Sequence, residues 1–236
     1  MATELFRASD IESGYGRVQV LWGAGITVSE SESAVLLGAN GAGKTTLLKV
    51  LMGIVPAWRG EIVFSGRDIT RMRTDLRVQS GITYMSEIGC FPGLTIEENL
   101  RIGGQFSSAA EFRRRMETLF GVFPWLAERR RQLAGSLSGG QRKMLGIAKA
   151  LVGGPRVVIM DEPSAGLSPL MVKELIRVLG QFRTQGLAFI IAEQNVKFLE
   201  LADLVYTLDG GRIGFKGTVA AVHENDALRR AYFGLK

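Results

Sequence analysis

The sequence predicts an α/β fold with a mostly parallel sheet, an N-terminal antiparallel β layer and an inserted α-helical lobe. Short alternating strands follow one another closely up to about residue 64, which is typical of an antiparallel layer. Between about residues 87 and 154 the apolar spacing is that of helices, and strand patterns are absent. After residue 156 a helix separates two uninterrupted apolar runs, which is the pattern of parallel strands covered on both faces.

The individual elements follow from the same periodicity. Strands are expected at Leu5–Ile11, Val18–Leu21, Ile26–Val28, Ser33–Leu37, Glu61–Phe64, Ile82–Met85, Val157–Met160, Leu187–Ala192, Leu204–Leu208 and Ile213–Lys216. Helices are expected at Thr45–Met52, Thr95–Ile102, Ala109–Phe120, Gly140–Leu151 and Leu170–Phe182, with short helices in the C-terminal tail. The turn Ser65–Asp68 is expected to end the strand before it. We expect a single domain over 1–236, with a core of 1–86 and 156–236 and a helical lobe of about 87–155.

The composition is that of a globular protein without membrane spans. Of the 236 residues, 46% are hydrophobic and 22% are charged, which is enough apolar surface for a full core. No segment approaches the roughly 20 apolar residues needed to cross a bilayer, and the first residues lack a signal-peptide core, so we expect a cytoplasmic protein. Cys90 is the only cysteine and His223 the only histidine, which excludes an internal disulfide and zinc sites of the usual Cys/His kind.

The net charge of +6 includes two arginine runs, Arg113–Arg115 and Arg129–Arg131. A solvated helix face or helix end explains such runs most simply. The alternatives are contact with an anionic membrane leaflet or with nucleic acid. No aromatic residue is interleaved with these arginines, which weakens the nucleic-acid alternative.

Residues Gly38–Thr45 fit the phosphate-binding pattern G-x-x-x-x-G-K-[ST]. An apolar strand precedes them and a helical pattern follows, which argues against a glycine-rich turn without a ligand. The glycines let successive backbone N–H groups converge on an anion, and the helix adds its positive end. Lys44 is expected to reach the β- and γ-phosphates, and Thr45 to place its hydroxyl on Mg²⁺. The expected nucleotide-binding residues are Gly38, Ala39, Asn40, Gly41, Ala42, Gly43, Lys44, Thr45 and Thr46.

Two acids, Asp161 and Glu162, follow the apolar run 157–160. An acid at the carboxyl end of a parallel strand faces the ligand crevice. We therefore expect Asp161 to hold Mg²⁺, and Glu162 to polarise a water for attack on the γ-phosphate. An exposed acidic strand end is the alternative, which the phosphate-binding pattern upstream makes less attractive.

The segment Leu137–Gln141, Leu-Ser-Gly-Gly-Gln, opens the expected helix. Ser138 and Gln141 can form a capping box, a purely structural role. The adjacent Gly139 and Gly140 weaken the first turn of a helix but expose backbone N–H groups at its positive end, which makes a second anion site. Two phosphate-binding helix ends and one nucleotide suggest two chains, each offering Ser138, Gly139, Gly140 and Gln141 to the ATP held by the other.

In order and spacing, these motifs resemble the ATP-binding cassette family, the nucleotide-binding subunits of ABC transporters, over nearly all the sequence. Ser164–Ser168, after the two acids, is similar to a further family motif. The resemblance implies ATP hydrolysis in a head-to-tail dimer, with the helical lobe touching membrane subunits. It also implies that Tyr15 stacks on adenine; without the family, packing or a turn explains Tyr15 equally well.

Two positions depart from the usual family pattern. Glu87 stands where most members have glutamine; it can bind Mg²⁺, or it can point away and pair with an arginine. Gln194 stands where most have a histidine; it can donate to the γ-phosphate but cannot carry charge. With Ala192–Asn195 and Pro163–Pro169, these changes are similar to the ATPase subunits of high-affinity branched-chain amino acid importers. Urea and short-chain amide importers share this architecture.

The expected function is therefore an ATP hydrolase that energises a membrane importer, for branched-chain amino acids or a related small amide or amino acid, with ATP and Mg²⁺ as cofactors. Its expected partners are a second ABC ATPase subunit, identical or related, permease subunits and, indirectly, a periplasmic or extracellular solute-binding protein, with no specific nucleic acid. The protein would lie on the inner face of the cell membrane, held there by the permease. The alternatives are a soluble cassette ATPase acting on nucleic acid or ribosomes, and a catalytically weak regulatory cassette.

Overall fold

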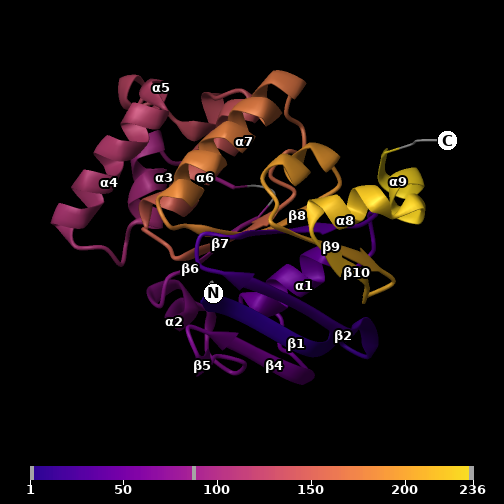
Figure 1. Cartoon of the computed structure of the whole chain (residues 1–236). Helices are drawn as coiled ribbons and strands as arrows, with labels where there is room; N and C mark the ends of the chain where they lie inside the picture. Colours follow the sequence, from indigo (N-terminus) through magenta and orange to yellow (C-terminus); the bar gives the residue numbers. More distant parts are fainter. Residues whose placement is uncertain (1–2, 87–88, 234–236) are drawn as a thin grey trace.

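The computed structural model describes residues 3–86 and 89–233 and confirms the expected fold class (Figure 1). Within these residues, one sheet has the strand order β10-β9-β3-β8-β7-β6. Its strands are β3 (Ser33–Leu37), β6 (Ile82–Met85), β7 (Val157–Asp161), β8 (Ala188–Glu193), β9 (Leu204–Asp209) and β10 (Arg212–Gly217). All of them run parallel except β10, which is antiparallel to β9. Each strand expected in this sheet is confirmed, with its ends shifted by at most one residue.

The second sheet is the expected antiparallel layer, with the strand order β2-β1-β4-β5. It contains β1 (Glu4–Tyr15), β2 (Val18–Ser29), β4 (Arg59–Phe64) and β5 (Arg67–Asp68). The expectation of two strands, Val18–Leu21 and Ile26–Val28, is wrong, because β2 continues through both. Ala24 pairs with Ile11 and Trp22 with Glu12, so Gly23 is the extra residue of a β-bulge, with a φ of +75° that glycine adopts without strain.

The turn after β4 is tighter than expected. Only Ser65 and Gly66 form it, with φ angles of +51° and +75°, and Arg67 and Asp68 already pair with β4. Positive φ at both central residues is the signature of a two-residue hairpin turn whose twist matches that of the strands. The four-residue turn expected at Ser65–Asp68 is therefore a two-residue hairpin turn followed by a short edge strand.

The helices expected from the sequence are confirmed, with somewhat different ends. They are α1 (Lys44–Leu51), α3 (Ile96–Gly103), α4 (Ala109–Val122), α6 (Gly139–Val152), α7 (Pro169–Thr184), α8 (Val219–Glu224) and α9 (Asp226–Phe233). Two more helices, α2 (Thr74–Gln79) and α5 (Pro124–Glu128), were not expected. With six and five residues, they are too short to show a helical period. Two 3₁₀ turns, η1 (Ala134–Ser136) and η2 (Val196–Glu200), complete the helical elements.

The central sheet separates two hydrophobic cores, and alternate side chains of its strands enter each. In β7, Val157 and Ile159 pack with α1 and the antiparallel sheet, whereas Val158 and Met160 pack with α6 and α7. All residues of β7 and β8 are buried. Because side chains alternate across a strand, burial on both faces requires an uninterrupted apolar run. The two cores therefore explain the continuous apolar runs of the sequence.

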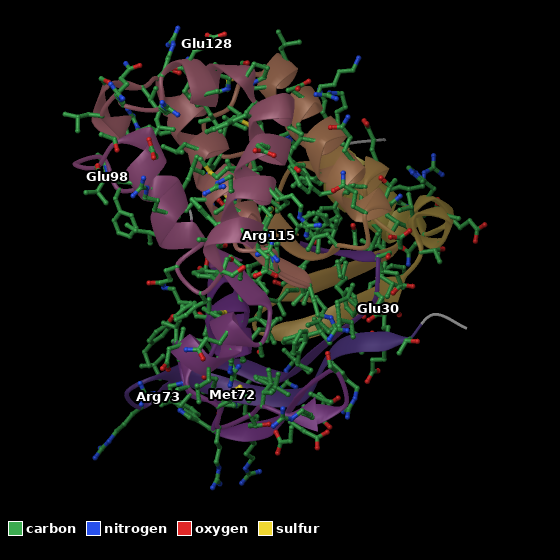
Figure 2. The ribbon with its side chains drawn as sticks, turned by 90° about the vertical axis from the view of Figure 1, so that its left-hand side faces the viewer. Glu30, Met72, Arg73, Glu98, Arg115 and Glu128 are labelled. Atoms are coloured by element: carbon green, nitrogen blue, oxygen red, sulfur yellow. The ribbon has the colours of Figure 1, made fainter. Side chains whose placement is uncertain are left out.

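The helices α3, α4 and α6 lie on one side of the central sheet, and close contacts join them to each other and to the chain that follows α6 (Figure 1). A Cβ added to Gly103 of α3 would lie 2.1 Å from the Lys149 carbonyl oxygen of α6, so this crossing admits only glycine. Arg115 of α4 donates to the Gly153 carbonyl at 2.7 Å, and Figure 2 places it between the helices and the sheets. One arginine of the Arg113–Arg115 run is thus a structural contact.

Arg77 of α2 is a fully buried cation that joins α2 to α1. It is 1% exposed, and its guanidinium donates to backbone carbonyls only, those of Val50, Leu51, Ile69, Thr70 and Met72. Burial lowers the pKa of Arg77 to about 10, so it stays protonated at neutral pH. Since Val50 and Leu51 belong to the last turn of α1, the guanidinium caps that helix and complements its negative end.

We predict that Arg77→Met lowers the free energy of unfolding by about 3 kcal/mol or more, because several buried carbonyls lose their donor at once. Urea unfolding followed by circular dichroism measures this. Arg73→Met is the matched control, since Arg73 is exposed and, among the residues described, pairs with Asp75 at the surface; we expect a change below about 1 kcal/mol. Equal unfolding midpoints for the two variants would show that Arg77 does not hold α1 in place.

Candidate functional site

The loop between β3 and α1 surrounds a small cavity at the carboxyl edge of the central sheet. Gly41 and Gly43 adopt φ angles of +81° and +105°, which non-glycine residues rarely tolerate, and Gly43 caps α1. The cavity, of about 160 Å³, is lined by Val20, Ala39, Asn40, Gly41, Gly43, Lys44, Thr45, Thr46 and Glu162. Gly38 and Ala42 do not line it: a Cβ on Gly38 would lie 2.5 Å from the Leu208 carbonyl oxygen, so this glycine serves the packing against β9.

Lys44 is the buried cation of this cavity. It is 4% exposed, and its Nζ donates to the carbonyl oxygens of Gly38 at 2.7 Å and Ala39 at 3.2 Å. The same nitrogen lies 3.3 Å from Glu162 Oε1, in an ion pair. The ammonium group is therefore held at the cavity wall by two carbonyls and one carboxylate.

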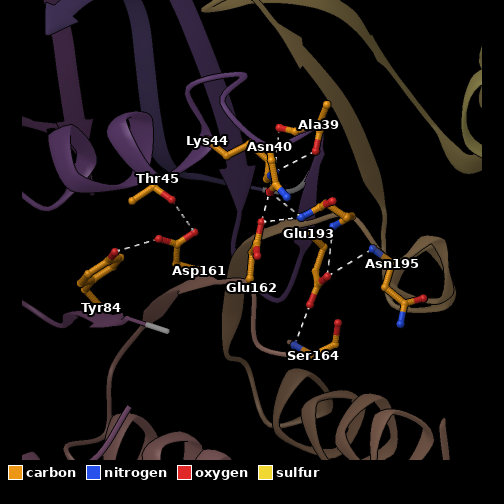
Figure 3. A network of polar contacts seen from close by, with 12 residues as sticks. Ala39, Asn40, Lys44, Thr45, Tyr84, Asp161, Glu162, Ser164, Glu193 and Asn195 are labelled. Carbon is orange, nitrogen blue, oxygen red and sulfur yellow. Dashed lines mark hydrogen bonds and ion pairs between the residues drawn. The ribbon is translucent and has the colours of Figure 1, made fainter. Parts of the chain in front are cut away.

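Asp161, the last residue of β7, receives hydrogen bonds from two hydroxyl groups (Figure 3). Thr45 Oγ1 donates to its Oδ1 at 3.1 Å, and the Tyr84 hydroxyl donates to its Oδ2 at 3.2 Å. Burial raises the pKa of Asp161, while the two hydrogen bonds act in the opposite direction. Burial and the neighbouring carboxylate raise the pKa of Tyr84, so the tyrosine stays a neutral donor.

Glu162 has a φ of +45°, an uncommon conformation for a residue with a side chain. Its N–H donates to the Ala192 carbonyl of β8 at 2.9 Å, which holds this strained residue at the edge of the sheet. Its carboxylate is a quarter exposed, with a side-chain exposure of 25%, and faces Lys44. Strained residues held by their surroundings cluster at functional sites, and this one carries a carboxylate at the cavity.

Gln194 follows β8 and joins the loop to Glu162. Its Nε2 donates to Asn40 Oδ1 at 2.8 Å and to Glu162 Oε1 at 3.0 Å. A side-chain amide has two N–H hydrogens, so both are engaged by these two acceptors. The amide thus orients the carboxylate of Glu162 relative to the phosphate-binding loop.

The structure brings together Asn40, Lys44, Thr45, Asp161, Glu162 and Gln194, which the sequence predicts as site residues. Tyr15 lies at the end of β1, 47% exposed, with its hydroxyl 3.5 Å from Thr46 Oγ1. Glu87 lies outside the described residues.

The segment beginning at Ser138 forms the capping box that the sequence allows. Ser138 Oγ accepts from the Gln141 N–H at 3.3 Å, and Gln141 Oε1 accepts from the Ser138 N–H at 3.1 Å. No residue of 137–141 lines the cavity beside Lys44. Within the described part of this chain, the phosphate-binding loop and the helix start at Ser138 therefore do not share one cavity.

Two residues near the site were not expected from the sequence, Tyr84 and Glu193. Tyr84 lies on β6, next to β7, and its role depends on a strand pairing that its own sequence does not reveal. Glu193 is 2% exposed and accepts three backbone N–H bonds, from Ser164, Gln194 and Asn195. One signal was available for Glu193: it is the first polar residue after the apolar run Leu187–Ala192.

In the part of the chain that the structure describes, no helix is long and apolar enough to cross a membrane.

Comparison with known proteins gives a consistent family. Residues 21–165 match the model of the ABC transporter family. The chain is 37% identical to the high-affinity branched-chain amino acid transport ATP-binding protein BraG of Pseudomonas aeruginosa, over 95% of this chain and 97% of the relative. It is 32% identical to a probable branched-chain amino acid transport ATP-binding protein, LivF, of Archaeoglobus fulgidus, over 98% and 99% of the two chains. It is also 32% identical to the lipopolysaccharide export system ATP-binding protein LptB of Haemophilus influenzae, over 98% and 97%.

Solved structures agree. A nucleotide-free ATP-binding cassette from an ABC transporter superposes with a TM-score of 0.84 at 25% identity, covering 98% of this chain and 99% of that one. An ATP-binding cassette in its ADP conformation superposes with a TM-score of 0.82 at 26% identity, covering 99% and 100%. With the phosphate-binding loop and the two acids at one edge of the sheet, these matches show that the chain belongs to the ABC transporter family, as one of its nucleotide-binding, ATP-hydrolysing subunits.

Proposed function

We propose that this subunit energises the import of branched-chain amino acids or of a related small amino acid or amide. The similarity to BraG, which extends over 95% of the chain, carries the proposal. Gln194 and Glu87, at two positions where most cassettes have histidine and glutamine, add to it. The similarity to LptB favours a second candidate, lipopolysaccharide export, at a lower identity of 32%.

The cavity beside Lys44 is the proposed site of the ATP phosphates. Backbone N–H groups of the loop, the start of α1 and the Lys44 ammonium together offer a concentrated positive field to an anion. The Glu162 carboxylate forms an ion pair with this ammonium group, so a phosphate group entering the cavity competes with the carboxylate for Lys44. A phosphate that binds Lys44 would free the Glu162 carboxylate, which already lines the cavity, from this ion pair.

The residues beside the cavity fit Mg²⁺. Thr45 Oγ1 and Asp161 Oδ1 lie 3.1 Å apart, and both are hard oxygen donors of the kind Mg²⁺ prefers. Mg²⁺ is usually bound by one or two carboxylates together with waters and substrate phosphates, so a carboxylate beside a hydroxyl suits it. When bound, the ion supplies charge neutralisation on the phosphate oxygens. We propose Thr45 and Asp161 as its ligands, with Glu87 as a further candidate.

Glu162 is the proposed general base. Its carboxylate lines the cavity, and the amide of Gln194 holds it at 3.0 Å. A base must lie within hydrogen-bond reach of the water whose proton it accepts, so a carboxylate fixed at the cavity wall is suited to this role. Gln194 is neutral at all relevant pH values and acts as a fixed donor.

A second copy of this chain, or a related ATPase, is proposed to complete the site with Ser138, Gly139, Gly140 and Gln141. A Cβ added to Gly139 would meet only Arg142 Nη2, at 3.9 Å, so the packing of this chain does not require glycine there. Gly140 differs, since its Cβ would lie 2.4 Å from Met171. Gly139 thus leaves space at the helix start, where backbone N–H groups have no partner in the helix. We also propose that the exposed Tyr15 stacks on adenine.

We propose that the chain acts as one cassette, with a core of 1–86 and 156–236 and a helical lobe of about 87–155. Its partners would be permease subunits and, indirectly, a solute-binding protein outside the membrane. The inner face of the cell membrane is the proposed location.

We predict that Glu162→Gln lowers the rate of ATP turnover at least about a hundredfold, because the amide cannot accept a proton from water. ATP binding should be retained or become tighter, since the ion pair with Lys44 no longer competes. Phosphate release and binding of a fluorescent ATP analogue measure the two quantities. Glu200→Gln, an exposed residue of η2, is the control; turnover of Glu162→Gln near that of the control would exclude Glu162 as the base.

We predict that Tyr84→Phe raises the Mg²⁺ concentration for half-maximal ATP turnover about tenfold, because Asp161 loses the donor that orients its Oδ2. Tyr206→Phe is the control: it also removes a hydrogen-bonded tyrosine hydroxyl, but one that is bonded to Thr27. Titration of turnover with Mg²⁺ at fixed ATP compares the two. Equal Mg²⁺ dependence would mean that Tyr84 does not act on a metal ligand.

The transport proposal predicts that the subunit, purified from membranes of its natural host, brings permease subunits with it. After reconstitution into liposomes with its solute-binding protein, leucine, isoleucine or valine should stimulate ATP turnover and accumulate inside. Stimulation by urea or a short-chain amide would change the solute but keep the import function. Release of lipopolysaccharide would favour the second candidate, and co-sedimentation with ribosomes or DNA would contradict transport.

A further inference from the structure

The structure assigns a positioning role to Glu193, the last residue of β8. We propose that its carboxylate ties the segment Ser164–Ser168 to the backbone of Gln194, and thereby sets how the Gln194 amide meets Glu162. The inference rests on the proposed roles of Gln194 and Glu162, and it adds a residue that does not line the cavity.

The two carboxylate oxygens of Glu193 serve two different segments (Figure 3). Oε1 accepts from the Ser164 N–H at 2.7 Å, in the loop that leads from β7 to α7. Oε2 accepts from the N–H groups of Gln194 at 3.1 Å and Asn195 at 3.2 Å. Two successive N–H groups that converge on one anion fix the local backbone, so Oε2 determines the direction in which the Gln194 side chain leaves the chain.

This position requires a carboxylate. Glu193 is 2% exposed, and all three of its contacts in the described structure are N–H donors, which only an acceptor can satisfy. An ionised carboxylate accepts at both oxygens, whereas an amide has one accepting oxygen and one donating nitrogen. Glutamine of the same shape would therefore turn its NH₂ group toward either the Ser164 N–H or the N–H pair of Gln194 and Asn195, and one segment would be released.

The contacts form a continuous chain from the loop to the proposed base. Ser164 binds Glu193, Glu193 binds the Gln194 backbone, and the Gln194 side chain binds both Glu162 and Asn40. Ser164 is itself two residues after Glu162, whose N–H is bonded to β8. Glu193 thus closes a ring in which a displacement of the loop changes the contact between Gln194 and Glu162.

The first test compares Glu193→Gln with the parent. Under saturating MgATP we expect kcat to fall tenfold to a hundredfold, since small misplacements of a reacting group cost about this much. The dissociation constant for ATP should change much less than kcat, because Lys44 is held by the carbonyls of Gly38 and Ala39 and not by Glu193. Asp203→Asn is the control, an exposed carboxylate at the opposite end of the sheet that accepts the Ser33 N–H at 2.9 Å and pairs with Arg183. Parental kcat in Glu193→Gln would overturn the proposal.

The second test is a double-mutant cycle, which distinguishes an effect of Glu193 on kcat through Gln194 from a purely structural role. If Glu193 acts through Gln194, the Glu193→Gln change should add little further loss of kcat in a Gln194→Ala background. Losses that multiply would overturn the proposal, because they would show that Glu193 acts independently. A parent protein that does not hydrolyse ATP at all would instead contradict the proposed function.

The third test does not depend on turnover. In the nucleotide-free protein, Glu193→Gln should speed deuterium uptake in whichever of the two segments it releases, 162–168 or 193–196. Asp203→Asn should leave the uptake of both segments unchanged. Glu193→Asp keeps the charge but is one methylene too short to reach both segments, so it should have the same effect as Glu193→Gln. Unchanged uptake in both segments for both variants would overturn the proposal.

Discussion

The position of β8 between β3 and β7 in the central sheet is the constraint on which the rest of the structure depends. It brings the carboxyl ends of three strands together, so that the loop after Leu37, the acids after Met160 and the turn after Ala192 meet at one edge. The segment after β3 contributes a cation and backbone N–H groups, the end of β7 contributes carboxylates, and the turn after β8 contributes an amide. Parallel strands place ligand sites at this edge for the same geometric reason in other open α/β sheets.

The elements around this edge hold the side chains with little freedom. The Lys44 ammonium has two carbonyl partners and a carboxylate, Asp161 has two hydroxyl donors, and Glu193 has three N–H donors. Arg77 acts at the far end of α1, where it caps the helix that begins at Lys44. The helix is therefore fixed at one end by a buried guanidinium and carries the proposed phosphate site at the other.

The sequence predicts those parts of the fold and site that depend on short-range patterns. Gly38–Thr45 and the acids after 157–160 could be recognised because strand, loop and helix follow one another directly in the chain. Tyr84 could not be found, because only the pairing of β6 with β7 brings its hydroxyl to Asp161. The sequence pattern breaks at the Gly23 bulge although the strand continues, because a glycine at positive φ interrupts the alternation without ending the ladder. Helices such as α5 are stabilised by tertiary packing, with Leu126 fully buried, rather than by a pattern long enough to read.

The alternation of β7 between the two cores ties stability to chemistry within a single strand. Deleting one residue from Val157–Met160 would turn the side chains that follow the deletion to the opposite face of the sheet, and these include the acid that meets Thr45 and Tyr84. The alternation of side chains along β7 thus sets both the packing of the cores and the direction of the Asp161 carboxylate. This strand therefore cannot change in length without moving core side chains or the acid at its end.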